Sequence, residues 1–167
     1  MRYVLATLLL AFMAALQASV FSRFSVGPTA PQMVLLSVVA WSLLRGPVEG
    51  MYWGFAGGLL YDLASGGPIG VSALAMVAVA AIAGSFGGRL FGTNPLLPML
   101  AVFAATVTYF VIASFLLATL HYRTDWAGAL LQVALPAAAA NGILSLIVYP
   151  LFAFVAAHTS RQARVEF

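Results

Sequence analysis

The chain of 167 residues contains no cysteine and no lysine, and only 7% of its residues are charged. Without cysteine it can form no disulfide, thiolate metal site or cysteine nucleophile. Its basic residues are seven arginines that are spread along the chain. Because nucleic-acid binding needs a concentrated basic face, this distribution argues against a nucleic-acid partner. Scattered arginines instead suit short loops at an anionic membrane surface.

Catalytic motifs are also missing from the sequence. It contains no H-E-x-x-H, no G-x-S-x-G, no pair of carboxylates at catalytic spacing and no glycine loop of the kind that holds a phosphate. His121, Arg123 and Asp125 form a local polar cluster, which we interpret as a solvated loop and not as a metal site. We therefore predict a protein that is not an enzyme and that binds no cofactor or metal.

Apolar residues, by contrast, are abundant. They make up 63% of the chain, and the mean hydropathy is +1.06. A soluble domain has about 45–50% apolar and about 25% charged residues, and a soluble fold of this length could not bury so much apolar surface. The composition therefore predicts an all-α polytopic membrane protein in contact with the lipid bilayer.

Six uncharged or nearly uncharged stretches predict about six transmembrane helices in a single helical domain, 1–167. The stretches are 3–22, 31–44, 51–65, 69–88, 96–120 and 127–157. The first is long enough to span about 30 Å of hydrocarbon, so we predict a retained helix and not a cleaved signal peptide. The second stretch is short for a span. The last is long, with Pro136 and Pro150 as possible bends, so a seventh element stays open.

The arginines also predict the orientation. With six spans and a cytoplasmic N-terminus, five arginines fall on the cytoplasmic side and two outside, in agreement with the positive-inside rule. The five are Arg2, Arg45, Arg89, Arg161 and Arg164, and the two are Arg23 and Arg123. Both termini are therefore expected in the cytoplasm.

Small residues repeat every four positions in the third stretch. On a helix they would form one stripe, made of Gly50, Gly54, Gly58, Asp62 and Gly66. Such spacing lets a second helix backbone come close, and that helix could belong to this chain or to another protein. A second packing face is predicted from Gly84, Gly88 and Gly92.

Asp62 is a carboxylate well inside a predicted span. An acid at the centre of a membrane helix costs about 2.5–3.5 kcal/mol, so it should face protein and not lipid. It could accept hydrogen bonds from Ser65, Ser72 or the backbone amides of 68–71, which enter the fourth helix. The alternatives are a proton or cation carrier and a contact with a partner. A transporter usually has further ionisable groups inside its spans, and this sequence predicts none.

Two further predictions concern isolated polar and aromatic residues. Asn141, near the middle of the last stretch, is expected to hydrogen-bond another helix. Trp41, Trp53 and Trp126 lie near predicted span ends and are expected in the aromatic belts at the membrane surfaces.

The segment GFAGGLLYDLASGGPIGVSAL, residues 54–74, resembles the signature of the rod shape-determining protein MreD family. That signature is G-x-x-x-G-x-x-x-D-x-x-S-G-x-x-x-G-x-x-A-L, and the matching residues are Gly54, Gly58, Asp62, Ser65, Gly66, Gly70, Ala73 and Leu74. The resemblance implies a non-enzymatic inner-membrane subunit of the bacterial cell-elongation complex, which supports cell shape and peptidoglycan synthesis. The implied partners are a single-span MreC-like protein and, directly or indirectly, RodA with its penicillin-binding transpeptidase. The resemblance assigns no partner-binding residues.

A second possibility stays open. In size and helix count, MreD-like proteins resemble the substrate-binding membrane subunits of energy-coupling-factor vitamin transporters. Those subunits often carry an A-x-x-x-A contact near the first helix, and Ala11 with Ala15, or Ala14 with Ala18, has this spacing. A vitamin pocket needs several convergent polar groups, of which the sequence shows few.

Overall fold

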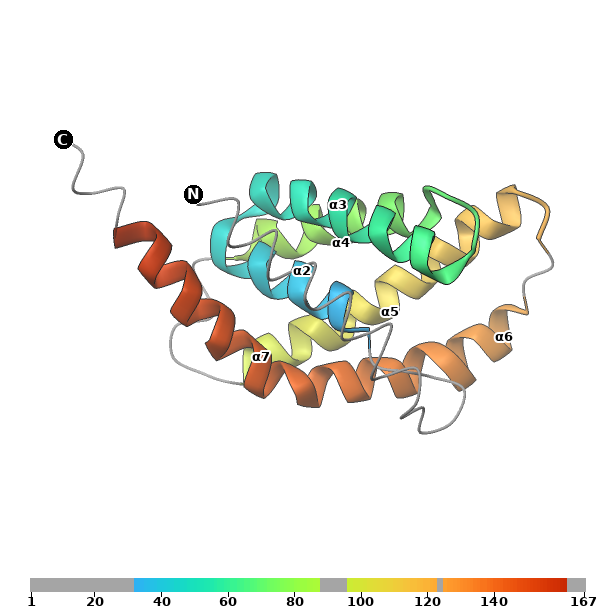
Figure 1. Ribbon diagram of the computed structural model, residues 1–167. Helices are drawn as coiled ribbons and strands as arrows, with labels where there is room; N and C mark the ends of the chain where they lie inside the picture. The colour runs from blue at the N-terminus through green and yellow to red at the C-terminus, as the bar shows by residue number, and fades with distance from the viewer. Residues whose placement is uncertain (1–31, 88–95, 123–124, 162–167) are drawn as a thin grey trace.

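The computed structural model describes residues 32–87, 96–122 and 125–161, all of whose regular elements are helices (Figure 1). These are α2 (Met33–Arg45), α3 (Pro47–Ser65), α4 (Val71–Phe86), α5 (Leu96–Thr119), α6 (Trp126–Gly128), the π-helix η2 (Ala129–Ala134) and α7 (Leu135–Arg161). Helices α2, α3, α4 and α5 run in alternating directions, and α6, η2 and α7 together return as one continuous helix. The "Arg45 end" of the bundle therefore holds the ends of α2, α4 and α7, and the "Asp62 end" holds the turn from α3 to α4 and the connection from α5 to α6.

The described helices agree with the predicted stretches to within a few residues. The largest differences are of four residues: α3 begins at Pro47 instead of 51, and α7 ends at Arg161 instead of 157. Proline suits the first helical position, where no N–H is needed, and Glu49 places a negative charge in the first turn. Gly46, with φ +93°, separates α3 from α2. The first predicted stretch, 3–22, lies outside the described residues, so the count of six helices stays a prediction.

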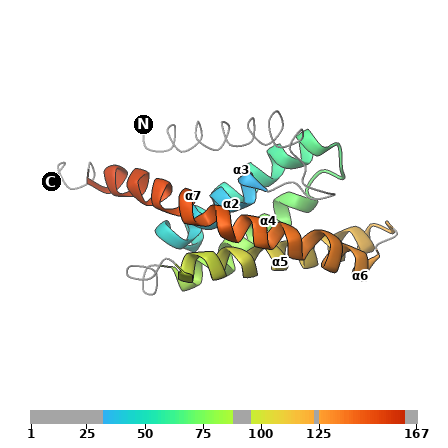
Figure 2. The same ribbon diagram turned by 90° about the horizontal axis from the view of Figure 1, so that it is seen from below.

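Helix α2 is short because it lies in the centre of the bundle. All its residues from Met33 to Leu43 are buried, and it packs against α3, α4, α5 and α7 (Figure 2). A helix that is apolar all round needs such surroundings. Its 13 residues are about 20 Å long, less than the roughly 30 Å of hydrocarbon that a full span crosses. Helix α2 is therefore a core helix whose N-terminus lies inside the protein.

Asn141 holds that buried N-terminus. The Gln32 N–H donates to Asn141 Oδ1 at 3.1 Å, and Asn141 Nδ2 donates to Thr106 Oγ1 at 3.2 Å. The Thr106 hydroxyl in turn donates to the Val102 carbonyl at 2.8 Å. Because Asn141 lies on α7 and Thr106 near the middle of α5, the chain of bonds joins three helices at mid-depth. The predicted interhelical hydrogen bond of Asn141 is confirmed.

Two of the three tryptophans lie inside the bundle instead of at its surface. Trp41 and Trp53 are only 5% and 8% exposed, and their rings meet edge to face with centroids 6.0 Å apart. Phe152 packs against Trp41 in the same way at 6.2 Å. The aromatic-belt prediction is therefore wrong for Trp41 and Trp53, because neighbouring helices surround α2 up to its end. Trp126 is 48% exposed.

The last predicted stretch forms one continuous helix in the described residues. The six-residue π-helical segment η2 comes just before Pro136, which has no N–H to donate to the preceding turn. Pro150 lies inside α7 without ending it. A seventh element is therefore not seen within 126–161.

Within the described residues, two helices are long and apolar enough to cross a membrane, Leu96–Thr119 and Trp126–Ala157. Only 28% and 33% of their most apolar windows are buried inside the protein, so they are not core helices of a water-soluble domain. Large apolar side chains are exposed on α3 and α4 too, including Phe55, Leu63, Leu74 and Phe86. An apolar surface of this extent requires lipid or protein to cover it.

Candidate functional site

The glycines of the predicted stripe pack within the chain. Gly58 lies against the Ala73 backbone, and a Cβ added to Gly58 would collide with it. A Cβ on Gly54 would lie 2.8 Å from the Met76 carbonyl oxygen, and one on Gly50 would collide with the Ser42 side chain of α2. Backbone-to-backbone contact of this kind needs residues without side chains. Helices α2 and α4 thus occupy this face of α3, and it is not available to another protein.

Two glycines of the signature shape the turn between α3 and α4. Gly66 follows the last residue of α3 with φ +67°, and Gly70 precedes α4 with φ +102°. Both conformations are ones that glycine adopts far more readily than other residues. An added Cβ at either position would meet nothing within 4 Å. Gly66 therefore serves the turn and lies beyond the part of the stripe that packs against a helix.

Asp62 closes this turn from inside. It is 2% exposed, and its carboxylate accepts three backbone hydrogen bonds, from Gly70 N–H at 2.8 Å, Ser72 N–H at 3.0 Å and Ala73 N–H at 3.3 Å. The first N–H groups of a helix have no partner in the helix itself, and the helix dipole is positive there. The Asp62 carboxylate of α3 thus caps the start of α4. These hydrogen bonds explain why a buried acid is tolerated at this position.

The hydroxyl groups of the two serines near Asp62, Ser65 and Ser72, have different hydrogen-bond partners. The Ser65 hydroxyl donates to the backbone carbonyl of Asp62 at 3.2 Å. The Ser72 hydroxyl accepts from the Tyr109 hydroxyl at 3.0 Å, which connects the hairpin to α5. Leu74, the last residue of the signature, is 58% exposed on the outside of α4.

Part of the second glycine face can also be placed. A Cβ on Gly84 would lie 2.5 Å from Pro47 Cα, at the start of α3. Gly87, which the sequence did not single out, approaches the Leu43 carbonyl oxygen equally closely, with 2.5 Å for an added Cβ. Gly88 and Gly92 lie outside the described residues.

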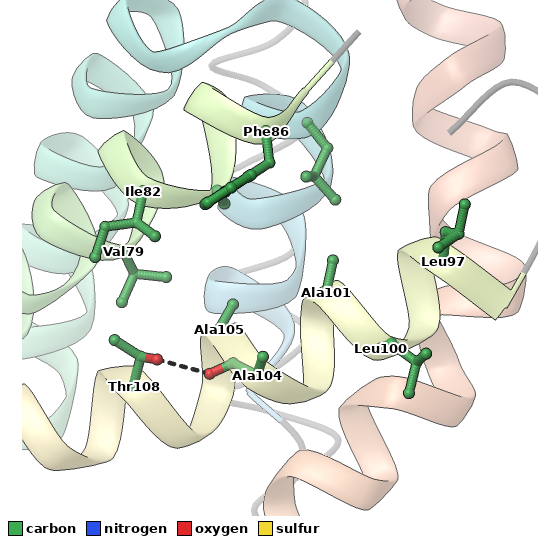
Figure 3. A pocket seen from close by; sticks show the side chains of 11 residues that line it. Val79, Ile82, Phe86, Leu97, Leu100, Ala101, Ala104, Ala105 and Thr108 are labelled. Carbon is green, nitrogen blue, oxygen red and sulfur yellow. Dashed lines mark hydrogen bonds between the residues drawn. The ribbon is translucent and has the colours of Figure 1, made fainter. Parts of the chain in front are cut away.

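An apolar groove lies on the other side of α4, between α4 and α5 (Figure 3). It has a volume of about 360 Å³ and lies toward the Arg45 end. Val79, Ile82 and Phe86 form its α4 side. On its α5 side, Leu97 and Leu100 lie at the start of the helix, followed by the small residues Ala101, Ala104, Ala105 and Thr108. We call it the α4–α5 groove.

The groove is apolar in chemistry as well as in composition. Thr108 Oγ1 donates to the Ala104 carbonyl at 2.8 Å, so this hydroxyl is satisfied within its own helix (Figure 3). The spacing of Ala101 with Ala105, and of Ala104 with Thr108, is the sequence signal that could have indicated the groove. In a chain this rich in alanine, the spacing alone is too common to be informative.

In the polar loop between α5 and α6, the described residues 121, 122 and 125 form the helix ends. Asp125 Oδ1 accepts from the Gly128 N–H at 3.2 Å and so caps α6. His121 takes φ +64° just beyond α5, and the Tyr122 N–H closes the helix end on the Leu117 carbonyl at 3.1 Å. Arg123 lies outside the described residues. Within the described ranges, no group of three or more His, Cys, Asp or Glu side chains could hold a metal ion.

Spanning-length apolar helices and glycine-packed backbones define the class, a small helical membrane protein. A family model described as rod shape-determining protein MreD matches residues 1–156, and the chain therefore belongs to the MreD family. No curated protein and no solved structure matches it. The similarity to energy-coupling-factor subunits accordingly stays a prediction, and the vitamin-transport alternative gains no support from the family match.

Proposed function

We propose that this chain is a multi-pass, non-enzymatic subunit of the bacterial cell-elongation complex in the inner membrane. In this proposal it binds the transmembrane helix of a single-span MreC-like partner. RodA and its penicillin-binding transpeptidase join directly or through that partner, so the chain supports peptidoglycan synthesis without catalysing it. Membership of a rod shape-determining family supports the cellular role. The observation that carries the helix-binding role is the α4–α5 groove.

The groove fits a helix because much of its α5 side consists of small side chains. In a membrane, helices associate through van der Waals packing and not through the hydrophobic effect, so a surface that admits a close backbone is favoured. Ala101, Ala104 and Ala105 provide such a surface, and Ile82 and Phe86 provide larger side chains beside it. The glycine stripe is already filled by α2 and α4. The α4–α5 groove is thus a described surface where a further helix could pack closely.

Disulfide cross-linking tests this assignment directly, because the chain has no native cysteine. Ala104→Cys is co-expressed with an MreC-like partner that carries single cysteines along its transmembrane helix. We expect oxidation to give a cross-linked heterodimer at one helical face of the partner. Ala139→Cys is the matched control, since Ala139 is exposed on α7 and does not line the groove. Equal cross-linking at both positions, or none at Ala104, would contradict the proposal.

A filled groove provides the second test. Ala104→Phe places a large side chain in the groove, and an overpacked contact costs about 1–3 kcal/mol. We expect about a tenfold or greater loss of co-purified partner, with the chain itself still folded. Ala139→Phe should leave the partner bound. If Ala104→Phe retained the partner and displaced only lipid, the groove would be an acyl-chain site.

A further inference from the structure

The α3–α4 hairpin, Pro47–Phe86, has an apolar outward face. Large apolar side chains are exposed along its whole length, namely Val48, Tyr52, Phe55, Leu60 and Leu63 on α3 and Leu74, Ile82 and Phe86 on α4. Of these residues, only Ile82 and Phe86 line the α4–α5 groove. The outward face of α3 is therefore a surface separate from the groove.

Polar groups mark both ends of this face. At the Arg45 end, Arg45 Nε lies 3.3 Å from Glu49 Oε2 in the first turn of α3. At the Asp62 end, α3 stops at Ser65, and the irregular backbone of Gly66 and Gly67 is exposed. Exposed irregular backbone does not occur in the hydrocarbon of a bilayer, because its N–H and C=O groups would have no partners there. Both ends of the hairpin therefore belong in the headgroup layers.

The apolar stretch between these two ends is shorter than a bilayer is thick. Residues 50–64 of α3 are about 22 Å long, and the 16 residues of α4 are about 24 Å long. The hydrocarbon of a typical bilayer is about 30 Å thick. Any tilt of the hairpin would reduce the thickness that it spans still further. The hairpin is thus too short by about 6–8 Å.

The other side of the bundle has the opposite mismatch. Helix α5, with 24 residues, is about 36 Å long, and the 32-residue helix Trp126–Ala157 is about 48 Å long. Long helices match a bilayer by tilting, and α5 crosses the bundle obliquely to α3 and α4 (Figure 1). A short helix cannot lengthen, so at the hairpin the lipid has to adjust instead.

We propose that the α3–α4 hairpin thins the bilayer beside it and is preferentially surrounded by phospholipids with short acyl chains. Thinning brings the two headgroup layers closer on this side, while the bilayer beside α5 and α7 keeps its full thickness. The proposal does not depend on partner binding at the α4–α5 groove, because it follows from the length of the hairpin and the polar groups at its ends.

Quenching of tryptophan fluorescence by brominated lipid tests this, because it reports which lipid lies beside a given helix. Trp126→Phe removes the exposed native tryptophan, whereas Trp41 and Trp53 are buried. In this background, Ala56→Trp reports on the middle of α3. Ala139→Trp on α7 is the matched control, since both alanines are exposed.

The full-length chain is reconstituted in dimyristoleoylphosphatidylcholine mixed with dibrominated dioleoylphosphatidylcholine. The same mixture with unbrominated dioleoyl lipid in place of the short lipid is the reference without a difference in chain length. We expect the short lipid to be enriched about twofold beside Ala56→Trp and not beside Ala139→Trp, because a shorter chain relieves the mismatch only at the hairpin.

Equal enrichment at the two positions, or none at Ala56→Trp, would overturn the proposal. Absence of quenching at Ala56→Trp in pure brominated lipid would overturn it as well, since protein and not lipid would then cover the hairpin. Phe55→Trp, at a position that is 56% exposed on the same helix, provides the reading if Ala56→Trp does not fold.

Discussion

The two sides of α4 are built in opposite ways. Toward α3, Ala73 and Met76 meet the backbones of Gly58 and Gly54 with no room for a single added carbon. Toward α5, Val79, Ile82 and Phe86 border an open groove. The residues of the family signature concentrate on the closed side and in its turn, and none of them lines the groove. The signature therefore marks how the molecule is constructed, and a partner surface is better sought where the signature is absent.

Gly58→Leu should have the largest effect, because the closed side has no space for it. Its Cβ alone would collide with the Ala73 backbone, which cannot move without displacing α4. We expect no folded protein in detergent, measured by size-exclusion chromatography of a fluorescent fusion. If the variant folded and bound its partner normally, the closed side would be misassigned.

A matched pair of alanine variants controls for helix propensity. Gly58→Ala should cost about 1–3 kcal/mol through overpacking. Gly142→Ala should be neutral or stabilise the protein by up to about 1 kcal/mol, because an alanine is a better helix former than glycine. At Gly142 the nearest atom to an added Cβ is the Met99 carbonyl oxygen at 3.5 Å, an ordinary contact.

Asp62→Leu should rank second, because it leaves three N–H groups of the closed side without an acceptor, two of them buried and that of Gly70 partly buried. Each unpaired group costs about 1–3 kcal/mol. We therefore expect the free energy of unfolding to fall by about 3 kcal/mol or more. Asp62→Asn keeps one acceptor oxygen and should lose less. Both are measured by equilibrium unfolding in mixed micelles. Equal and complete loss for Asn and Leu would instead indicate that the charge of Asp62 is needed.

Asn141→Leu tests the hydrogen bonds that join α7 to the buried start of α2 and to α5. It removes the acceptor of the Gln32 N–H at the buried start of α2. The expected cost is about 1–3 kcal/mol in the same unfolding measurement. Gln132→Leu, at an exposed position of η2, is the control and should change stability little. A neutral Asn141→Leu would show that the buried N-terminus has another acceptor.

Ala104→Phe should have the smallest effect on stability, because Ala104 is exposed on the open side. Surface substitutions of this kind usually stay within about 0.5 kcal/mol. A normal unfolding curve together with the loss of partner described above would sharpen the contrast between the two sides. A large destabilisation would mean that the groove is closed in the folded protein.

The described helices could be predicted from sequence because their signals are local: proline, glycine and charge mark the ends of α3 and α4. The cap on α4 was predicted only in part. Of the amides 68–71, that of Gly70 donates to Asp62, and the other two donors are the N–H groups of Ser72 and Ala73. The burial of Trp41 and Trp53 could not be predicted in this way. It depends on α2 being surrounded by four helices, and no local pattern records how many neighbours a helix has.

The groove and the buried start of α2 were missed for a related reason. Ala104 and Ile82 are ordinary residues of apolar helices, and only the placement of α4 beside α5 makes them line a groove. Gln32 lies at the start of the second predicted stretch, 31–44, and gave no signal, because its importance comes from the depth at which α2 starts. Such properties arise from how helices are placed and not from which residues they contain.

The central position of α2 has a consequence for biosynthesis. Every described helix that surrounds it, from α3 to α7, follows it in the chain and leaves the ribosome later. At 13 residues, α2 is shorter than the roughly 20 apolar residues of a full span. The Gln32 N–H at its buried start gains its acceptor, Asn141, only when α7 has been made. The core around α2 is therefore completed by the last described helix to be synthesised.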